Sequence, residues 1–254
     1  MFDPPRAPEY TIWAVAFVLF LTDAARLLSA REVLLVETGR GRLAAAFAAN
    51  PYTLGGRVLS FGPLHLPYRG VFIAPWNRAW SDAATVQTVV DRLRRLGHSL
   101  FVPRVLALSA FCLLFVVGPA LTFLLGVSAA IVLIALALYA TVLVAIGCVW
   151  WQRATFGLSA RKATFITLEL LACPAFLPNL VRKITTSIPV EADAAQILSA
   201  TSTGDVTEEF LARLETRTEA LLGELKPDES LEGDLRAYLA AVKGARETCR
   251  SSSR

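Results

Sequence analysis

Two ionisable residues, Asp23 and Arg26, lie one helical turn apart in the apolar stretch VLFLTDAARLL. Inside a membrane such groups often belong to an ion path or to a buried contact between helices. An arginine near a helix end can instead extend its stem along apolar surface, place its charge among the lipid headgroups and draw a nearby carboxylate with it. We expect the pair to seat the end of a membrane helix in this way. The alternatives are a buried contact with the predicted hairpin over 104–151 and a functional carboxylate at Asp23.

Glu169 is a second carboxylate in an apolar run, ATFITLELLACPAFLPNLV, residues 163–181. A carboxylate at mid-depth costs about 2.5 to 3.5 kcal/mol on insertion scales, and Pro174 and Pro178 remove helix donors. Basic residues flank the run at both ends. We therefore expect an amphipathic interfacial or re-entrant segment over 152–190 rather than another span.

Other residue types that perform chemistry occur without the spacing that the chemistry needs. The four cysteines form no CxxC pair, and the two histidines are far apart. The glycine-rich pieces TGRGR and TLGGR match no phosphate-binding loop, and no motif of a hydrolase, kinase or metalloprotease occurs. The sequence therefore predicts no catalytic residue, no cofactor and no metal site, and it favours a protein that is not an enzyme.

The net charge of +4 comes largely from arginines that flank apolar segments. Arg92, Arg94 and Arg95 lie at the end of an amphipathic stretch, where they would meet anionic headgroups at the cytoplasmic face of a membrane. A specific lipid or polyphosphate pocket is the alternative for these three cations. No aromatic signature of RNA binding accompanies them. We expect membrane lipids as partners, and no nucleic acid.

The elements that must position these residues are those of a membrane protein. Of the 254 residues, 55% are hydrophobic, and the mean hydropathy is +0.52, above the usual range of soluble chains. Two uncharged runs, 105–125 and 127–151, reach the roughly 20 residues that cross a bilayer, and only Gly126 separates them. The second run ends in Trp150 and Trp151, a residue type enriched at headgroup level. The sequence predicts a transmembrane hairpin over 104–151.

A further span is predicted over 11–30, although only residues 12–22 are continuously apolar. The first ten residues carry more acid than base, which disfavours a signal peptide. Lysine and arginine gather after this helix and outside both ends of the hairpin, so the positive-inside rule places residues 1–10 outside and residues 31–103 and 191–254 in the cytoplasm. The excess of arginine over lysine, 21 to 4, suggests a bacterial inner (plasma) membrane.

The cytoplasmic segment before the hairpin has the pattern of a small folded module. Residues 31–80 hold short β-branched and aromatic runs between glycines and prolines, which is typical of an antiparallel β-meander. The piece RLAAAFAAN could be a strand or a helix, because its alanines favour a helix and its position between two turns favours a strand. Ser81 and Gly97 predict the start and the end of an amphipathic helix over 82–96.

The segment 191–254 has the pattern of two amphipathic helices. Asp205 or Thr207 would cap the first helix, and Asp228 would cap the second. A short link between them predicts an αα-hairpin. Each apolar stripe needs a surface to cover it, which the tail alone is too small to provide.

These patterns predict an α-helical integral membrane protein with three transmembrane helices, a small cytoplasmic β-meander plus helix, and a C-terminal αα-hairpin. We expect its function to be protein–protein interaction through the cytoplasmic modules, as in an accessory subunit of a membrane complex, with a protein partner or a second copy of the chain. One alternative is a small transporter or channel component, with Asp23 and Glu169 on an ion path. Another is a lipid-modifying membrane enzyme, in which polar groups converge near Glu169.

Overall fold

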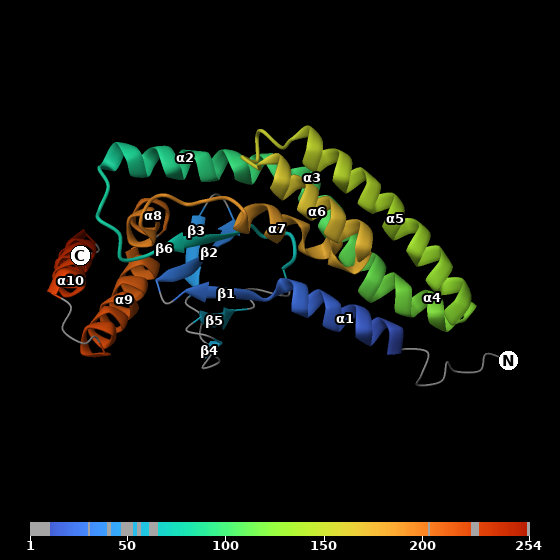
Figure 1. Ribbon diagram of the computed structural model, residues 1–254, viewed down its shortest axis with the longest axis horizontal. Helices are drawn as coiled ribbons and strands as arrows, with labels where there is room; N and C mark the ends of the chain where they lie inside the picture. The colour runs from blue at the N-terminus through green and yellow to red at the C-terminus, as the bar shows by residue number, and fades with distance from the viewer. Residues whose placement is uncertain are drawn as a thin grey trace. The chain divides into compact units, whose positions relative to one another are not determined.

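The computed structural model describes residues 11–29, 31–39, 42–46, 53–54, 57–60, 66–202, 204–224 and 229–252. The protein is mostly helical, with two small sheets, and Figure 1 labels the elements. The chain divides into two compact units, each assembled from three separate stretches. The first unit comprises Met1–Leu27, Leu59–Phe72 and Arg95–Ile188, and the second comprises Leu28–Val58, Ile73–Arg94 and Pro189–Arg254.

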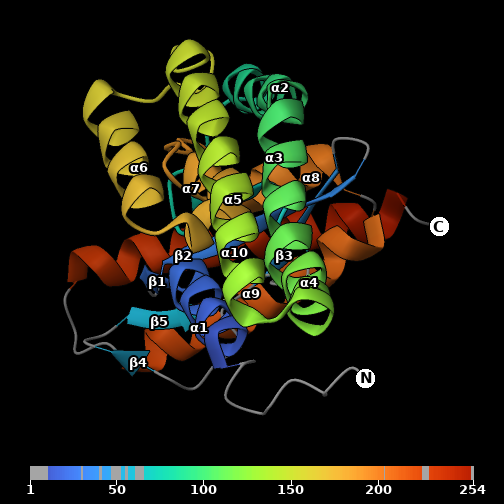
Figure 2. The ribbon, with the colours of Figure 1, turned by 90° about the vertical axis from the view of Figure 1, so that its right-hand side faces the viewer.

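The first unit is helical. Its elements are α1 (Thr11–Ala24), α3 (Phe101–Cys112), the π-helix η2 (Leu113–Val117), α4 (Gly118–Leu125), α5 (Val127–Trp151), α6 (Ala160–Ala172), the 3-10 helix η3 (Pro174–Asn179) and α7 (Leu180–Thr186). The continuous helix α3–α4 pairs with α5, and α6 lies beside α5 (Figures 1 and 2). Because η3 contacts α1, α3, α5 and α6, four helices meet at this short turn.

Two helices of the first unit are long and apolar enough to cross a membrane. Phe101–Leu125 and Val127–Trp151 have 25 residues each, which is about 37 Å of helix at 1.5 Å per residue. Gly126 links them at a φ of 82°, a left-handed conformation that glycine adopts without the steric cost of a Cβ. Only 22% and 28% of their most apolar windows are buried. The prediction of two segments of spanning length joined at Gly126 is confirmed.

Each helix of this pair buries one narrow stripe of side chains. On α5 the buried positions recur every three or four residues, at Ala130, Ile134, Leu138, Val142, Ala145 and Val149. This spacing places them on one face of the helix. Two alanines in the stripe, Ala130 and Ala145, allow the paired helices to approach closely, and many side chains on the other faces of α5 are exposed.

The predicted span over 11–30 is wrong in its last third. Helix α1 ends at Ala24, and Arg26–Ser29 form strand β1. Its 14 residues amount to about 21 Å, short of the roughly 30 Å of a bilayer's hydrocarbon core. The helix ends here because Arg26 turns back and donates through Nη1 to the Asp23 carbonyl at 3.1 Å, which a longer helix would have bonded itself. Within the described ranges, two helices rather than three have spanning length.

The predicted interfacial segment 152–190 is broken into α6, η3 and α7. The longest of these, α6, has 13 residues, so the segment does not form another helix of spanning length, as predicted. Trp150 Nε1 donates to Thr167 Oγ1 at 3.0 Å, which joins the last turn of α5 to the middle of α6. Helix α6 therefore runs back along α5 (Figure 2), and η3, which contains both prolines, reverses the chain again.

Six short strands form two three-stranded sheets. The strands are β1 (Arg26–Ser29), β2 (Glu32–Gly39), β3 (Arg42–Ala46), β4 (Thr53–Leu54), β5 (Arg57–Ser60) and β6 (Val71–Pro75), in the orders β1-β5-β4 and β3-β2-β6. The expected single meander is thus divided between two sheets. In the antiparallel hairpin of β2 and β3, Leu35 is opposite Ala45, so the first half of the ambiguous stretch RLAAAFAAN is a strand. Residues 47–50 of that stretch lie outside the described residues.

The helix predicted over 82–96 is α2 (Ala83–Ser99). Asp82, rather than Ser81, caps its start, since the Asp82 carboxylate accepts the Thr85 hydroxyl at 2.5 Å and the Thr85 N–H at 3.3 Å. The helix also continues past Gly97. Glycine weakens a helix interior by only about 1 kcal/mol, and the apolar stripe of α2 runs on to the buried Leu100.

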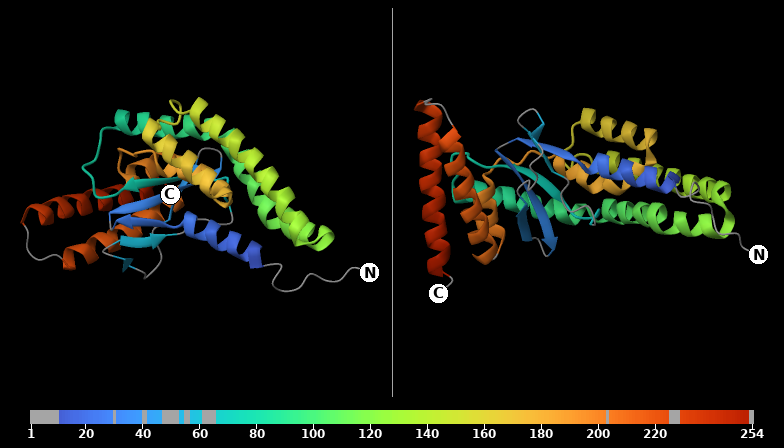
Figure 3. Two further views of the ribbon diagram at one scale, coloured as in Figure 1. Left: turned by 45° about the vertical axis from the view of Figure 1, so that its right-hand side comes forward. Right: turned by 90° about the horizontal axis from the view of Figure 1, so that it is seen from below.

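The C-terminal segment contains the predicted pair of helices, α9 (Gly204–Glu224) and α10 (Glu229–Ser252), which lie side by side (Figure 3). A short helix that we did not predict, α8 (Ala194–Thr201), precedes them. Asp205 and Thr207 are inside α9 rather than before it, and the predicted cap Asp228 lies outside the described residues. The two long helices bury apolar stripes and are joined by ion pairs, such as Arg246 Nη1 to Glu215 Oε2 at 2.7 Å.

Candidate functional site

A buried ion triad joins three helices of the first unit. Lys183 Nζ on α7 donates to Asp23 Oδ1 at 2.5 Å and to Glu169 Oε2 at 2.6 Å. The side chains of Lys183 and Asp23 are only 4% and 7% exposed, and that of Glu169 is 28% exposed. Asp23 is at the end of α1 and Glu169 is in α6, so the two carboxylates that the sequence singled out meet at one ammonium group.

Two residues of η3 complete the surroundings of the ion triad. The Asn179 amide is fully buried, and its Nδ2 donates to Asp23 Oδ2 at 3.1 Å and to the Phe20 carbonyl at 2.9 Å. Lys183 Nζ lies 5.1 Å from the centroid of the Phe176 ring, within the range of a cation–π interaction. The end of α1 is therefore fixed to η3 through a side chain and through the backbone.

Two guanidinium groups lie at the carbonyl end of α1. Arg26 donates to the carbonyls of Asp23 and Ala25, and Arg182 Nη1 donates to the Ala24 carbonyl at 3.3 Å. Positive charge is favourable at this end because the helix dipole leaves the last carbonyls partly negative. Burial, followed by the charge of Arg26, lowers the pKa of Arg182 to about 10, so this guanidinium stays charged at neutral pH.

The opposite end of α1 is held by aromatic side chains. Trp13 Nε1 donates to Thr122 Oγ1 on α4 at 2.9 Å. The Trp13 ring also lies on Gly118, where a Cβ would be 2.6 Å from two ring atoms. Between the two ends, aromatic rings interlock with centroids 4.9 to 6.3 Å apart; they belong to Phe17, Phe20, Phe111 and Phe115.

The chemistry open to the ion triad is limited. Lys183 acts as a charged donor to both carboxylates, and such charge-assisted bonds are the stronger kind of hydrogen bond. The nearby Cys173 is a poor nucleophile: burial raises the pKa of its thiol, and the Asp23 carboxylate acts in the same direction, so the reactive thiolate is scarce at neutral pH. The arrangement supports a structural connection between α1, α6 and α7.

The predicted side-chain pair of Asp23 with Arg26 is not formed. The Asp23 carboxylate turns to Lys183 and Asn179, whereas Arg26 bonds the backbone of Asp23. The alternative, a contact with the hairpin, is not formed by this carboxylate either, because its two partners, Asn179 and Lys183, belong to η3 and α7. Asp23 and Glu169 are brought together, as the transport hypothesis requires, but the Lys183 ammonium lies between them and bonds to both.

The three predicted cations at the end of α2, Arg92, Arg94 and Arg95, are far in sequence from the members of the ion triad. Arg94 and Arg95 are exposed and Arg92 is half-buried, and Arg94 is 3.7 Å from Asp91 on the same helix. Nothing in these positions joins the three arginines into one pocket, and their contact with lipid headgroups stays a prediction.

The predicted tryptophan pair at the end of α5 is exposed. Trp151 is 90% exposed, and Trp150 is 42% exposed while it donates to α6. The guanidinium of Arg153 lies 5.7 Å from the Trp150 ring. An aromatic ring with a cation beside it is common at the headgroup level of membranes, and the interfacial role of this pair stays a prediction.

The second unit has its own buried carboxylate. Asp193 caps α8 and accepts the Ala195 N–H at 2.8 Å, the Arg78 N–H at 3.2 Å and the Tyr238 hydroxyl at 3.1 Å. Burial raises the pKa of Asp193 although these donors oppose the shift. Close by, Ser81 and Gln196 exchange two hydrogen bonds, at 3.0 and 2.8 Å. The segment before α2 is therefore fastened to α8 and α10.

An open groove lies between α2, α8 and α10, which we call the α2–α10 groove. It has a volume of about 620 Å³ and is lined by small and apolar side chains with a polar minority, among them Trp80, Ala83, Val86, Gln196, Ser199 and Ala245. Trp80 is 40% exposed. The size falls within the range of sites that bind a side chain or a small molecule.

Sequence reasoning missed Lys183 and Asn179, which organise the site. In the sequence, Lys183 stands out only as one of the basic residues that flank an apolar run. The usable signal was that a carboxylate in such a run needs a counter-charge, and that Pro174 and Pro178 allow the chain to return between Glu169 and Lys183. Nothing in the sequence pointed to Asn179 or to the buried Asp193.

In the described parts of the chain, no three His, Cys, Asp or Glu side chains come close enough together to hold a metal ion. The chain matches no model of a protein family, and no curated protein and no solved structure is detectably similar to it.

Proposed function

We propose that the protein is an integral membrane protein, with α3–α4 and α5 as a transmembrane hairpin and with a second unit that binds a partner protein. The distribution of exposed apolar side chains supports this most strongly. Among the described residues, large exposed hydrophobic side chains lie in the first unit, with Trp80 and Val206 as the exceptions. Soluble monomers rarely expose contiguous apolar surface on this scale.

The hairpin carries the largest part of this surface. Leu136, Leu143 and Phe123 are 66%, 64% and 52% exposed, and no charged residue occurs between Val105 and Trp151. Leaving such side chains in water would forgo about 25 cal/mol for each Å² of apolar surface. Lipid hydrocarbon removes that cost, so a bilayer is the environment that these helices fit.

The charges at the ends of the hairpin support a cytoplasmic second unit. Arg104 precedes the first helix and Arg153 follows the second, whereas the turn at Gly126 has no cation. Under the positive-inside rule the turn faces away from the cytoplasm. We propose a bacterial inner membrane on the same basis and on the arginine-rich composition.

The α2–α10 groove supports protein binding by the second unit. Trp80 borders it, and tryptophan is enriched among the residues that contribute most binding energy at protein interfaces. Polar side chains such as Gln196 and Ser199 share the lining, as expected for an interface that also exists without its partner. A membrane hairpin that carries such a groove would hold a partner protein at the membrane, and we propose this accessory role in a membrane complex.

The membrane part of the proposal is tested by fractionation. We expect the full chain, expressed in bacteria, to stay in the membrane after washing at alkaline pH and to require detergent for extraction. A cysteine placed at Ser199, in a variant whose native cysteines are replaced by serine, should react with an impermeant maleimide only after the cytoplasmic face is opened. Recovery of a monodisperse protein without detergent would reject the membrane assignment.

The partner part is tested by crosslinking in intact cells with a photoreactive residue at Trp80. We expect a discrete crosslinked product that disappears when Ala245→Arg fills the groove. The matched control, Ala220→Arg on the exposed side of α9, should leave the product unchanged. A product that survives Ala245→Arg, or none at all from Trp80, would contradict binding at this groove.

The two alternative functions receive less support from the geometry. An ion path through Asp23 and Glu169 is disfavoured because Lys183 occupies both carboxylates; flux through reconstituted vesicles that Asp23→Asn abolishes would restore it. Polar groups do converge near Glu169, as a lipid-modifying enzyme would need, yet the two carboxylates are already bonded to Lys183, and burial raises the pKa of the Cys173 thiol. We therefore assign the ion triad a structural role.

A further inference from the structure

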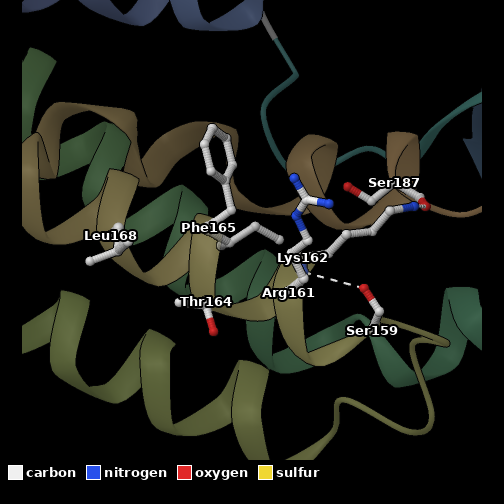
Figure 4. Close-up of a pocket in the computed structure, with 8 residues that line it drawn as sticks. Ser159, Arg161, Lys162, Thr164, Phe165, Leu168 and Ser187 are labelled. Atoms are coloured by element: carbon white, nitrogen blue, oxygen red, sulfur yellow. Dashed lines mark hydrogen bonds between the residues drawn. The ribbon is translucent and has the colours of Figure 1, made fainter.

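We propose that an open groove along α6 binds the headgroup and upper acyl chain of an anionic phospholipid. The groove, which we call the α6 groove, has a volume of about 910 Å³ and is drawn in Figure 4. Its polar lining comes from Ser159, Arg161, Lys162, Thr164 and Ser187, and its apolar lining comes from Phe165, Ile166 and Leu168. The inference rests on the proposed membrane location of the first unit.

The polar end of the α6 groove has donors to offer an anion. Arg161 is exposed and makes no hydrogen bond or ion pair within the described residues, so its five N–H groups are available. The Lys162 ammonium donates to the Ser187 carbonyl at 2.5 Å and keeps two further donors. The lining includes no carboxylate. A phosphate group therefore meets two cations here and no opposing charge.

The order of residues along α6 matches the anatomy of a phospholipid. Arg161, Phe165 and Leu168 are at positions i, i+4 and i+7, which places them on one face of the helix. In Figure 4 the Arg161 and Phe165 side chains extend to the same side of α6. Phe165 and Leu168 are 63% and 58% exposed. The face thus begins with a charge and continues with uncovered apolar surface.

The direction of α6 orients this face correctly for a lipid. Thr167 is bonded to Trp150 in the last turn of α5, and α6 runs back from there along the apolar helix (Figure 2). Leu168, next to Thr167, is therefore level with Trp150, and Arg161 lies about 10 Å before Leu168 along α6. Arg161 is thus on the headgroup side of the face, and Leu168 is where its apolar part meets the hydrocarbon. A soluble phosphate compound would use the cations but leave Phe165 and Leu168 uncovered, so an acyl chain explains more of the groove.

The test is lipid binding to the purified full chain in detergent, measured by native mass spectrometry. Dioleoyl phosphatidylglycerol is the anionic probe, and dioleoyl phosphatidylcholine is the zwitterionic control. We expect the wild type to retain the anionic lipid at least tenfold more strongly. The double variant Arg161→Gln and Lys162→Gln should lose this preference. Arg161→Gln alone, which removes no intramolecular bond of the described structure, should reduce it at least threefold.

Matched controls separate a built site from diffuse attraction. Arg94→Gln with Arg95→Gln removes two exposed cations elsewhere and should change retention less than twofold. Phe165→Asn should weaken retention at least threefold, whereas Phe123→Asn, on an exposed face of α4, should not. Equal losses in the groove and control variants, or equal retention of both lipids, would overturn the proposal. So would displacement of the lipid by inorganic phosphate, because that would show a site for the free anion.

Failure of this inference is distinguishable from failure of the proposed function. A wild type that resists alkaline washing but shows no lipid preference would reject the lipid site and keep the membrane hairpin. A wild type that is soluble without detergent would reject both.

Discussion

At the scale of single residues, the ion triad is an unequal arrangement of two carboxylates around one ammonium. Breaking a buried pair by removing one partner is costly because the other charge loses both water and its counter-ion. The two carboxylates are not equivalent, since Asp23 is 7% exposed and Glu169 is 28% exposed. The consequence of substituting each member should therefore differ in a defined order.

We expect Lys183→Met to be the most damaging change, because it leaves both carboxylates without their ammonium and removes roughly 3–5 kcal/mol of unfolding free energy, as measured for broken buried pairs. Asp23→Asn should cost less, because Glu169 still neutralises the lysine. Glu169→Gln should cost least. Thermal unfolding of the detergent-solubilised variants gives this order.

Glu209→Gln is the matched control, because it breaks an exposed pair with Arg213 on α9 and should not measurably change the unfolding temperature. The double variant Asp23→Asn with Lys183→Met should lose less than the sum of the single losses, since the two share one interaction. Equal effects of all three triad substitutions would contradict the structural role.

At the scale of elements, α1 depends on a close approach to α4. Trp13 lies where a Cβ on Gly118 would be, and its indole N–H is bonded to Thr122 one turn further on. The π-helix η2 immediately precedes this point and Pro119 follows it. A local π-helical turn can satisfy backbone groups that a proline leaves without partners. The Trp13 ring lies on Gly118, directly after this turn.

Gly118→Ala should destabilise the first unit by about 1–3 kcal/mol, the usual cost of overpacking a well-packed core. The matched control is Gly147→Ala on α5, where a Cβ meets nothing within 4 Å and alanine should be neutral or slightly stabilising. Unfolding temperatures in detergent measure both effects. In a Trp13→Ala background, which is itself destabilised, Gly118→Ala should cost less than it does in the wild type. An equal cost in both backgrounds would show that the ring is not the obstacle.

The elements that the sequence predicted well are those whose signal is local and long. The hairpin, α2 and the α9–α10 pair all follow from apolar periodicity that continues over many residues. Helix α1 ends earlier than predicted because Arg26 bonds the Asp23 carbonyl. This end is also held by Arg182 and Lys183, which are remote in sequence and contact the Ala24 carbonyl and the Asp23 carboxylate. Helix α8 was missed because its cap, Asp193, is supported by Arg78 and Tyr238, two contacts that no short window contains.

At the scale of the whole molecule, the chain crosses between its two units five times, since each unit is made of three stretches. The C-terminal stretch from Pro189 holds α8, α9 and α10, but Asp193 depends on Arg78, and α8 also contacts β3. The C-terminal stretch of the second unit is therefore incomplete without segments that come before the hairpin in the sequence.

We expect a fragment of residues 189–254 to keep part of the α9–α10 pairing and to lose α8. Amide hydrogen exchange should show protection of α8 amides such as Ala195 in the full chain and none in the fragment. The exchange of Leu214, which is buried in α9, serves as the internal control. Protection of Ala195 in the fragment equal to that in the full chain would show that the segment folds independently.

The five crossings also determine when the protein can be finished during synthesis. Residues 28–58 and 73–94 of the second unit leave the ribosome before the apolar hairpin, and residues 189–254 leave it afterwards. The early strands and α2 must therefore remain, with part of their apolar surface uncovered, until the hairpin and then the last helices have been synthesised. The second unit can therefore fold completely only after the hairpin has been synthesised. A chain that stops before Pro189 would expose apolar surface to chaperones and proteases.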